Sequence, residues 1–600
     1  MFIRRLRQRR QGAVYTYYSL VETVRCNGRV RQRTICYLGR LDNLRPPDWL
    51  RIAERLPDPA WLPLLQQEVG YTPPTPPAGP VRSCTIDPDS IAWANPRCLG
   101  DVHVALRTWK LLELDQLFER LLGRFRTSVP LPVVAALIAC NRLIDPRSER
   151  GIFGWWPKTA LPELQGVPRD RLHLNLLYRC LTKTAPHQLA IQQHLVRKGR
   201  ELFDFANDLI LYDLTSTYFE GRMAGNPKAQ RGYSRDHRGD CKQLCIGLVV
   251  NGDGFPLGFE TLAGNSRDAQ TLTPLITALE ERCGGTRGLV CFDRGMATEA
   301  NLHHWRQTQR HYLCAVRRKV TRSYLETIRQ GPWQSLRERG PHEPSIEVLE
   351  LPSQEVDGRS ERWLLCRSAG CQLKERQIFE TRLSRAREKL TKLQAQVAAG
   401  TFTTKDVILR KAKNAVGRTH DLCGIFHFAV RGRAPNKELV VQASASALQD
   451  QCDLQGVYLL RTTVADLQPR ELWHTYMLLT RVEAAFRNLK SDLSLRPIFH
   501  SKPANADAHV LFAMLAYAMS ITIQLRHRRA GGEQTTVALL EELRSVQLAE
   551  LSFRTADGDR LRFERSSIPT AKQHELLDGL GWPIPERYLP PDMGTEPARL

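Results

Sequence analysis

The sequence predicts an α/β protein in which a β-hairpin and a helical region precede a layered sheet. Apolar residues recur at helical spacing between residues 102 and 203, and strands then alternate with helices from residue 208 to 317. The chain has 600 residues, of which 42% are hydrophobic, so it is long enough for several cores. Domains of roughly 100 to 200 residues suggest about three to five units.

Positive charge is the clearest feature of the composition. Lys and Arg number 86 against 63 Asp and Glu, which gives a net charge of +23 and a pI near 9.6. This balance favours a polyanionic partner such as nucleic acid. Ribosome-associated and membrane-surface proteins share it, so charge alone leaves the partner open.

Cysteine usage and hydropathy argue against several classes of protein. The 15 cysteines form no C-x-x-C pair, and even Cys241 and Cys245 are expected to be reduced thiols of a cytosolic protein. The Arg-rich residues 1–10 lack the apolar stretch of a secretory signal. Val510–Leu525, with 16 uncharged residues, is short of the ~20 that span a bilayer. It is expected to be a buried helix, with no membrane partner.

The N-terminal region, residues 1–55, is predicted to be a basic β-hairpin. Ala13–Arg25 and Val30–Leu38 alternate like strands around Asn27-Gly28, a strong hairpin signal. Arginines precede and decorate it at Arg4, Arg5, Arg7, Arg9, Arg10, Arg25, Arg29, Arg31, Arg33 and Arg40. Arg29, Arg31 and Arg33 are candidate DNA contacts. A solvated strand face behind a disordered basic arm explains the same pattern, and both interpretations stay open.

A linker and a helical domain come next. Prolines crowd residues 56–82 and predict a linker. Residues 83–205 are expected to form a helical DNA-binding domain, with helices over Val102–Leu122, Leu131–Leu143 and Arg171–Phe203.

Strands and helices alternate in residues 206–320. Strands are expected at Asp208–Thr215, Cys245–Asn251, Pro256–Leu262, Gly288–Asp293 and Tyr312–Arg317, and helices at Ala269–Arg282 and Glu299–Arg306. Residues 321–465 are predicted to be an insertion of short strands around one polar helix, Gln372–Ala399. Residues 466–530 return to helices, Leu467–Leu489 and Ala508–Leu525, and residues 531–600 form a C-terminal tail without a clear pattern.

Two aspartates belong to apolar strands, Asp213 within one and Asp293 at the end of another. Asp213 follows Leu209-Ile-Leu-Tyr, and Asp293 follows Gly288-Leu-Val-Cys-Phe. A carboxylate within a sheet is costly unless a cation or hydrogen bonds offset it, and ligands commonly bind at strand ends. The alternatives are a hydrogen bond from Asp213 to the Thr215 or Ser216 hydroxyl, and helix capping by Asp293.

Glu483 is the third candidate acid. It lies in the helical run Tyr476–Lys490, with Arg487 at i+4 and Lys490 at i+7 on the same face. Taken alone, such a Glu and Arg are more often a surface ion pair. Three carboxylates together would supply the oxygen ligands that hard divalent ions prefer, and two such ions about 4 Å apart serve phosphodiester chemistry.

Five ordered motifs carry a resemblance. They are Tyr212-Asp-Leu-Thr-Ser-Thr-Tyr-Phe-Glu-Gly221, Gly232-Tyr-Ser-Arg-Asp-His-Arg-Gly-Asp240, Gly264-Asn-Ser-Arg-Asp268, Asp293-Arg-Gly-Met296, and Val482-Glu-Ala-Ala-Phe-Arg-Asn-Leu-Lys-Ser491 with Arg496-Pro-Ile. Over residues 1–530 the sequence resembles the DDE transposases of bacterial insertion sequences, in the IS-four-like superfamily and its sixteen-thirty-four-type branch. Asp268 opens a predicted helix, where capping is the favoured account, and the role of Asp240 stays undecided.

The resemblance implies an RNase H-like catalytic core with a β-rich insertion before the helix of the catalytic Glu. The family's catalytic, metal-binding positions fall on Asp213, Asp293 and Glu483. Its signature of Tyr, Arg, Glu and Lys around the third acid matches at Tyr476, Glu483 and Lys490, but Leu479 stands in place of Arg. Arg481 is a candidate substitute from another helix face. Arg487 and Arg294 complete the expected DNA contacts.

A transposase with these acids is expected to bind two Mg²⁺ ions, with Mn²⁺ as a substitute. Water would cut one strand at the terminal inverted repeats, and the freed 3′-OH would attack the opposite strand or target DNA. A homodimer on double-stranded DNA, in the bacterial cytoplasm with the nucleoid, is implied. The alternatives are a catalytically inactive or domesticated DNA-binding protein, and an RNase H-like nuclease that cuts without joining.

Overall fold

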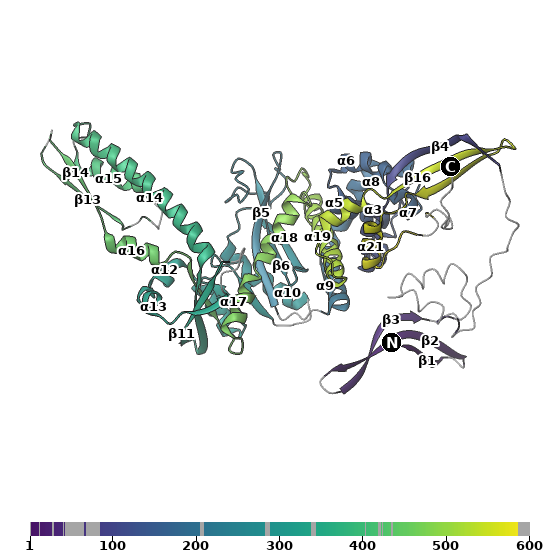
Figure 1. Cartoon of the computed structure of the whole chain (residues 1–600), viewed down its shortest axis with the longest axis horizontal. Coiled ribbons are helices and arrows are strands. Elements are labelled where there is room, and N and C mark those ends of the chain that lie inside the picture. The colour runs from purple at the N-terminus through teal and green to yellow at the C-terminus, as the bar shows by residue number, and fades with distance from the viewer. Residues whose placement is uncertain are drawn as a thin grey trace. The chain divides into compact units, whose positions relative to one another are not determined.

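The computed structural model describes residues 2–10, 13–26, 29–39, 41, 65, 67, 85–204, 209–282, 288–337, 344–402, 404–417, 422, 424–433, 436–585 and 588. The chain divides into two compact units (Figure 1). One comprises residues 1–95, 549–565 and 577–588, and the other comprises residues 96–548, 566–576 and 589–600. The predicted linker, residues 56–82, lies outside the described residues except for 65 and 67, and so does the Asn27-Gly28 turn.

The N-terminal sheet has three antiparallel strands: β1 (Phe2–Arg10), β2 (Ala13–Cys26) and β3 (Arg29–Gly39). The paired strands β2 and β3 confirm the predicted hairpin. The basic segment before it is not an arm, because β1 pairs with β2 from Phe2 to Arg10. The many arginines of β1 interrupt the alternation of apolar and polar residues by which a strand is predicted from sequence. Positively charged side chains are, however, common on strands at the edge of a sheet.

Helices α3 to α9 form the region between residues 100 and 203. They are α3 (Gly100–Leu111), α4 (Leu114–Leu122), α5 (Leu131–Ile144), α6 (Glu149–Trp155), α7 (Leu161–Gln165), α8 (Leu174–Thr184) and α9 (Gln188–Phe203). The expected helix over Val102–Leu122 is divided, because Glu113 adopts a left-handed backbone conformation between α3 and α4. Helix α6 begins at the Ser148 cap and was not predicted.

Nine strands form the large mixed sheet, in the order β10-β11-β12-β15-β9-β8-β5-β6-β7. Their bounds are β5 (Leu209–Tyr218), β6 (Gln243–Val250), β7 (Pro256–Ala263), β8 (Leu289–Phe292), β9 (Tyr312–Ala315), β10 (Gln334–Arg337), β11 (Ile346–Val356), β12 (Arg359–Ser368) and β15 (Val457–Thr462). Strands β5, β8 and β9 are parallel, and β6, β7 and β15 are antiparallel to their neighbours.

Two helices cover one face of the sheet centre, α10 (Asp268–Arg282) and α11 (Glu299–Gln307). Alternate residues of β5 and β8, including Tyr212 and Phe292, pack with Leu275 and Trp305 in a buried core on this face. Because side chains alternate along a strand, the intervening residues Leu211, Asp213 and Cys291 face the other side.

The other face carries α17 (Pro469–Met477), α18 (Thr480–Ser491) and α19 (Pro503–Arg529). The predicted single helix Leu467–Leu489 is two helices, because the chain turns at Leu478 and Leu479. Helix α19 also packs against α5 and α8, so the helical region and the sheet share it. Of the described helices, α19 alone is long and apolar enough to cross a membrane, and 83% of its apolar window is buried.

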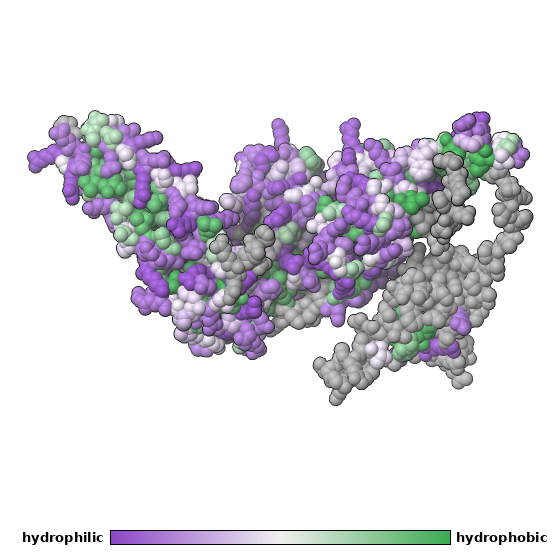
Figure 2. Space-filling model, in the orientation of Figure 1, coloured by the Kyte–Doolittle hydropathy of each residue, from purple (hydrophilic) through white to green (hydrophobic). Residues whose placement is uncertain are grey.

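Four strands of residues 321–465 extend the large sheet, since β10, β11, β12 and β15 pair in series beyond β9, whereas two others, β13 and β14, pair as a separate sheet. The same part of the chain also contains α12 (Arg318–Arg322), α13 (Leu325–Gln330), α14 (Ala369–Ala398), α15 (Lys405–Val416), β13 (Phe426–Arg431), β14 (Glu438–Ala443) and α16 (Ala445–Asp453). Helix α14 runs outward with α15, β13 and β14 at its far end (Figure 1). Apolar side chains gather there amid a hydrophilic surface (Figure 2).

The C-terminal segment, which had no clear pattern in the sequence, also folds. It contains α20 (Thr536–Leu543), β16 (Gln547–Thr555), β17 (Arg560–Ser566) and α21 (Ala571–Leu580). A three-stranded sheet in the order β17-β16-β4 joins it to β4 (Ile86–Cys98). One of the two strands that pair with β16 is β4, which lies about 450 residues earlier in the sequence. A short-range sequence pattern could not indicate this pairing.

Candidate active site

Asp213 and Asp293 are neighbours on adjacent parallel strands. Tyr212 of β5 stands opposite Phe292 of β8 in the register, so the two aspartates follow at the same level. Tyr212 and Phe292 are both fully buried on the α10 side. The aspartates therefore emerge together on the opposite face, which carries α17 and α18.

Each aspartate also accepts a hydrogen bond from the backbone N–H of the next residue. Asp213 Oδ1 accepts a hydrogen bond from the Leu214 N–H at 2.7 Å, and Asp293 Oδ1 accepts one from the Arg294 N–H at 2.7 Å. Helix capping by Asp293 is not what the structure shows, because Thr298 caps α11. The Asp213 side chain is half-buried and the Asp293 side chain is exposed.

Glu483 lies in the first turn of α18, which packs against β5 and β6. The helix buries Val482, Ala485, Phe486 and Leu489, and leaves Glu483 exposed on its flank. Among the residues that the structure describes, no three His, Cys, Asp or Glu side chains come close enough to hold one metal ion. The structure thus pairs the two aspartates and puts Glu483 on a helix packed against their sheet, without gathering the three carboxylates.

Tyr476 belongs to α17, and so to a different helix from Glu483. Burial, followed by the charge of Asp293, raises the pKa of its hydroxyl, and α17 packs against β8, the strand that precedes Asp293. Its ring lies 6.2 Å from the ring of Tyr458 on β15. Helix α17 begins with Pro469 and with Glu471 accepting a hydrogen bond from the Gln468 N–H at 2.8 Å, which fixes its entry next to the sheet.

Lys490, the last residue of the signature, forms an ion pair with Asp236. Its Nζ lies 2.8 Å from Asp236 Oδ1, and Arg496 donates to the same oxygen. The Lys490 and Asp236 side chains are only 11% and 3% exposed. Burial lowers the pKa of Lys490, and the Asp236 carboxylate partly offsets this. Sequence reasoning missed Asp236 as a partner, although it stands in the middle of the motif Gly232–Asp240.

Close packing explains two glycines of these motifs. A Cβ atom on Gly232 would lie 2.2 Å from the Gly264 carbonyl oxygen, and one on Gly264 would lie 2.0 Å from the Gln243 carbonyl oxygen. The Gln243 side-chain amide donates to the carbonyls of Tyr233 and Gly264. The loop of Asp236 is therefore held against β6 and β7 through contacts that only glycine permits.

The predicted DNA-binding cations differ in placement. Arg487 is exposed on the Glu483 flank and has no ion-pair partner within the described part of the chain. Arg294 is exposed and lines a pocket of about 320 Å³ with residues of α14. Arg481 is half-buried in the first turn of α18. Arg29, Arg31 and Arg33 are on β3, and their side chains lie outside the described residues.

Two further acids were left open by the sequence. Asp240 is exposed and forms an ion pair with Arg238 at 2.9 Å. Asp268 begins α10, as expected, and its side chain lies outside the described residues.

Two family models match the chain. One, described as the N-terminal domain of IS1634 family transposases, matches residues 3–57, and the other, described as the transposase DDE domain, matches residues 208–519. The second spans more than half of the chain and contains all three candidate acids. A cryo-EM structure of the piggyBac transposase synaptic complex with hairpin DNA is 11% identical, with a TM-score of 0.35, and the match covers 73% of this chain and 79% of that chain. No curated protein matches.

Proposed function

Because the chain belongs to the DDE transposases, in the IS1634 family, we propose that Asp213, Asp293 and Glu483 are its catalytic acids. As a transposase of this kind, it cleaves DNA at the terminal inverted repeats of an insertion sequence and transfers the cut strand. The observation that carries the assignment is the register of β5 and β8, which brings Asp213 and Asp293 side by side.

The same register supports an RNase H-like core for residues 206–320 and 466–530. The parallel strands β5, β8 and β9 form its centre, and the antiparallel β6 and β7 form one side. Helix α18 packs against β5 and β6. The division into a helical DNA-binding domain, an insertion and a C-terminal tail is proposed with the boundaries expected from sequence.

DDE transposases use divalent metal ions, and the donor chemistry at this site fits such ions. All three candidates are carboxylates, the oxygen ligands that Mg²⁺ prefers, and none is fully buried. We propose Asp213, Asp293 and Glu483 as ligands of two Mg²⁺ ions, with Mn²⁺ as a substitute. When bound, the ions would activate the attacking oxygen and stabilise the leaving one.

The cations around the acids support contacts to the DNA backbone. Arg487 lies one helical turn beyond Glu483 on an exposed flank, where it can pair with a phosphate. Arg294 stands next to Asp293 and is exposed as well. Tyr476, on the helix α17 that packs against β8, would orient the strand at the scissile phosphate. We also propose a homodimer on paired ends, in the bacterial cytoplasm with the nucleoid.

The test is cleavage of linear DNA that carries the element's end, taken from the sequence flanking the gene. Asp213→Asn, Asp293→Asn and Glu483→Gln should each abolish cleavage in Mg²⁺ while DNA affinity stays within a factor of two. Chelation by EDTA should abolish it in the native protein. Asp253→Asn, in the exposed turn between β6 and β7, is the matched control and should cleave normally.

Two outcomes separate the alternatives. Cleavage that survives Asp213→Asn would remove the catalytic assignment. A native protein that cuts but does not insert pre-cut ends into plasmid DNA would be a nuclease, and one that only binds the ends would be an inactive DNA-binding protein.

A further inference from the structure

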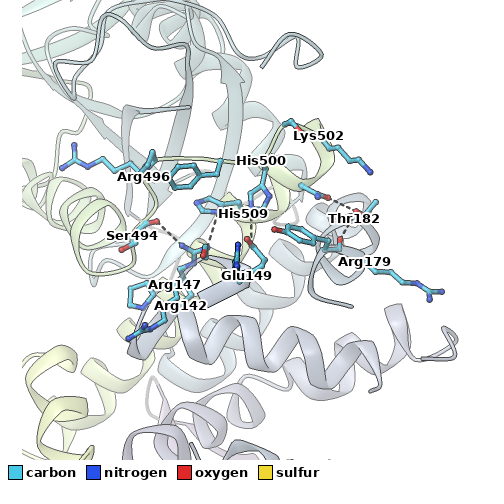
Figure 3. A pocket seen from close by; sticks show the side chains of 18 of the residues that line it. Arg142, Arg147, Glu149, Arg179, Thr182, Ser494, Arg496, His500, Lys502 and His509 are labelled. Carbon is cyan, nitrogen blue, oxygen red and sulfur yellow. Dashed lines mark hydrogen bonds and ion pairs between the residues drawn. The ribbon is translucent and has the colours of Figure 1, made fainter. Parts of the chain in front are cut away.

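A second basic site lies away from the three acids. A pocket of about 850 Å³ opens between the helical region and the segment that joins α18 to α19 (Figure 3). Its walls come from the end of α5, from α6 and α8, and from residues 494–505. Six of its lining residues are Arg or Lys and one is acidic, Glu149.

The floor of the pocket is a buried polar network. Arg142 donates to the Ser494 carbonyl at 3.1 Å and lies 3.2 Å from His509 Nδ1, while His509 Nε2 lies 3.1 Å from the Leu495 carbonyl. Glu149 pairs with His500 at 3.2 Å. Burial raises the pKa of Glu149, but the His500 hydrogen bond and the charges of His500 and Arg142 outweigh it, so the pKa is lowered. Glu149 therefore stays ionised, and His500 and Arg142 in the floor balance its negative charge.

The rim carries cations that the fold does not use. Arg150, Arg179 and Lys502 are exposed, and the structure gives them no carboxylate partner among the residues it describes. By contrast, Arg147 pairs with Asp145 at 2.9 Å, and Arg496 pairs with Asp236. A concave surface with unpaired charge of one sign concentrates counter-ions, so this rim attracts an anion.

Two aromatic rings stand among these cations. The side chain of Phe499 is 65% exposed and that of Tyr178 is 37% exposed, and both line the pocket. The ring of Tyr178 lies edge-on to His500, with ring centroids 6.2 Å apart, so Phe499 is the ring left mostly in water. Aromatic rings alternating with cations are the arrangement that binds single-stranded nucleic acid, in which bases stack on the rings and phosphates meet the cations.

We propose that this pocket binds an unpaired stretch of DNA, with phosphates on Arg150, Arg179 and Lys502 and a base stacked on Phe499. Paired bases inside a duplex have both faces covered, so only an unpaired base offers a face to the ring. The pocket also adjoins the sheet of the acids, because Ile498 pairs with Phe219 directly after β5. The proposal rests on DNA being the substrate.

The experiment measures binding of a fluorescein-labelled 12-nucleotide single strand to the full-length protein in EDTA. Phe499→Ala should weaken binding roughly tenfold, the loss of one stacked base. The logarithm of the binding constant falls as the logarithm of the salt concentration rises. The triple variant Arg150→Ala/Arg179→Ala/Lys502→Ala should make this slope less steep by about 2, as expected for three lost phosphate contacts on a single strand. The control Arg120→Ala/Arg126→Ala/Lys158→Ala removes the same charge from exposed positions outside the pocket.

The proposal is overturned if Phe499→Ala binds the single strand as tightly as the native protein, or if the pocket triple variant has the salt slope of the control. Because Phe499 is exposed, its removal should leave the melting temperature unchanged, which excludes loss of folding as the cause. Asp213→Asn should bind the strand normally while it fails to cleave. Failure of this proposal is therefore distinguishable from failure of the catalytic assignment.

Discussion

Replacing Asp236 by Asn should destabilise the unit that carries the acids. The Asp236 carboxylate is 3% exposed and is the counter-ion of both Lys490 and Arg496. Asparagine keeps the shape and one acceptor but removes the charge. Lys490, at 11% exposed, would then be a nearly buried cation without a counter-ion. The more exposed Arg496 can turn towards water.

Breaking a buried ion pair from one side costs about 3 to 5 kcal/mol. For a cooperative unit of about 450 residues, an unfolding entropy of ~2.1 cal/mol/K per residue means that ~1 kcal/mol lowers the melting temperature by ~1 °C. The expected loss is therefore about 3 to 5 °C. Removing Lys490 as well, in Asp236→Asn/Lys490→Met, should restore part of it, because no unpaired ammonium is left.

Differential scanning fluorimetry of the two single variants and the double variant measures this coupling. Asp240→Asn is the matched control, since Asp240 is in the same loop but 65% exposed in its pair with Arg238, and it should leave the melting temperature unchanged. A melting temperature for Asp236→Asn within 1 °C of the native value, or strictly additive single effects, would show that the pair does not hold the loop to α18.

Two other perturbations test buried charge elsewhere in this unit. Burial raises the pKa of Asp101 to about 6, above its unfolded value of 3.8. Between these two values the folded protein binds the proton more tightly than the unfolded chain does, so the free energy of unfolding falls as pH rises from about 4 through about 6. At pH 8, Asp101→Asn should therefore be more stable than the native protein by up to ~3 kcal/mol and should have the higher melting temperature. The difference in melting temperature between the two proteins should be smaller at pH 5. A difference that does not depend on pH would contradict this explanation. Glu361 is fully buried and accepts hydrogen bonds from Arg306 at 3.0 Å and from Arg461 and Tyr312. Glu361→Gln should cost about 3 to 5 kcal/mol and lower the melting temperature, whereas Glu299→Gln, at an exposed partner of Arg461, should change it little.

Local pattern predicts the strands of the site but not their pairing. The apolar runs before Asp213 and Asp293 correctly predicted β5 and β8. That the two strands are parallel neighbours depends on the crossover through β6, β7 and α10, which no short window contains. The same limit applies to β10, β11 and β12, which extend the large sheet through β15, because nothing in their sequences points to β15 as a partner.

The break between α17 and α18 was not predicted either, for a different reason. The run Met477–Thr480 contains no Gly or Pro, and its residues favour helix. The chain breaks here because the two segments bury different surfaces. Helix α17 buries Leu472 and Trp473, whereas α18 buries Val482 and Phe486, and both helices pack against the sheet. Tertiary packing thus overrides a continuous helical preference.

This break reassigns the residues around the third acid. On a single helix, Tyr476, Glu483 and Lys490 would share one face and would all be available to DNA. In the structure Tyr476 is on α17, which packs against β8 and β9, and Lys490 forms an ion pair with Asp236. An ammonium already paired inside the protein has little to gain from a phosphate, because the exchange would leave Asp236 buried without its partner. Arg487 has no ion-pair partner among the described residues and lies one turn from Glu483. We therefore propose that Arg487 makes the backbone contact expected of this signature and that Lys490 positions α18.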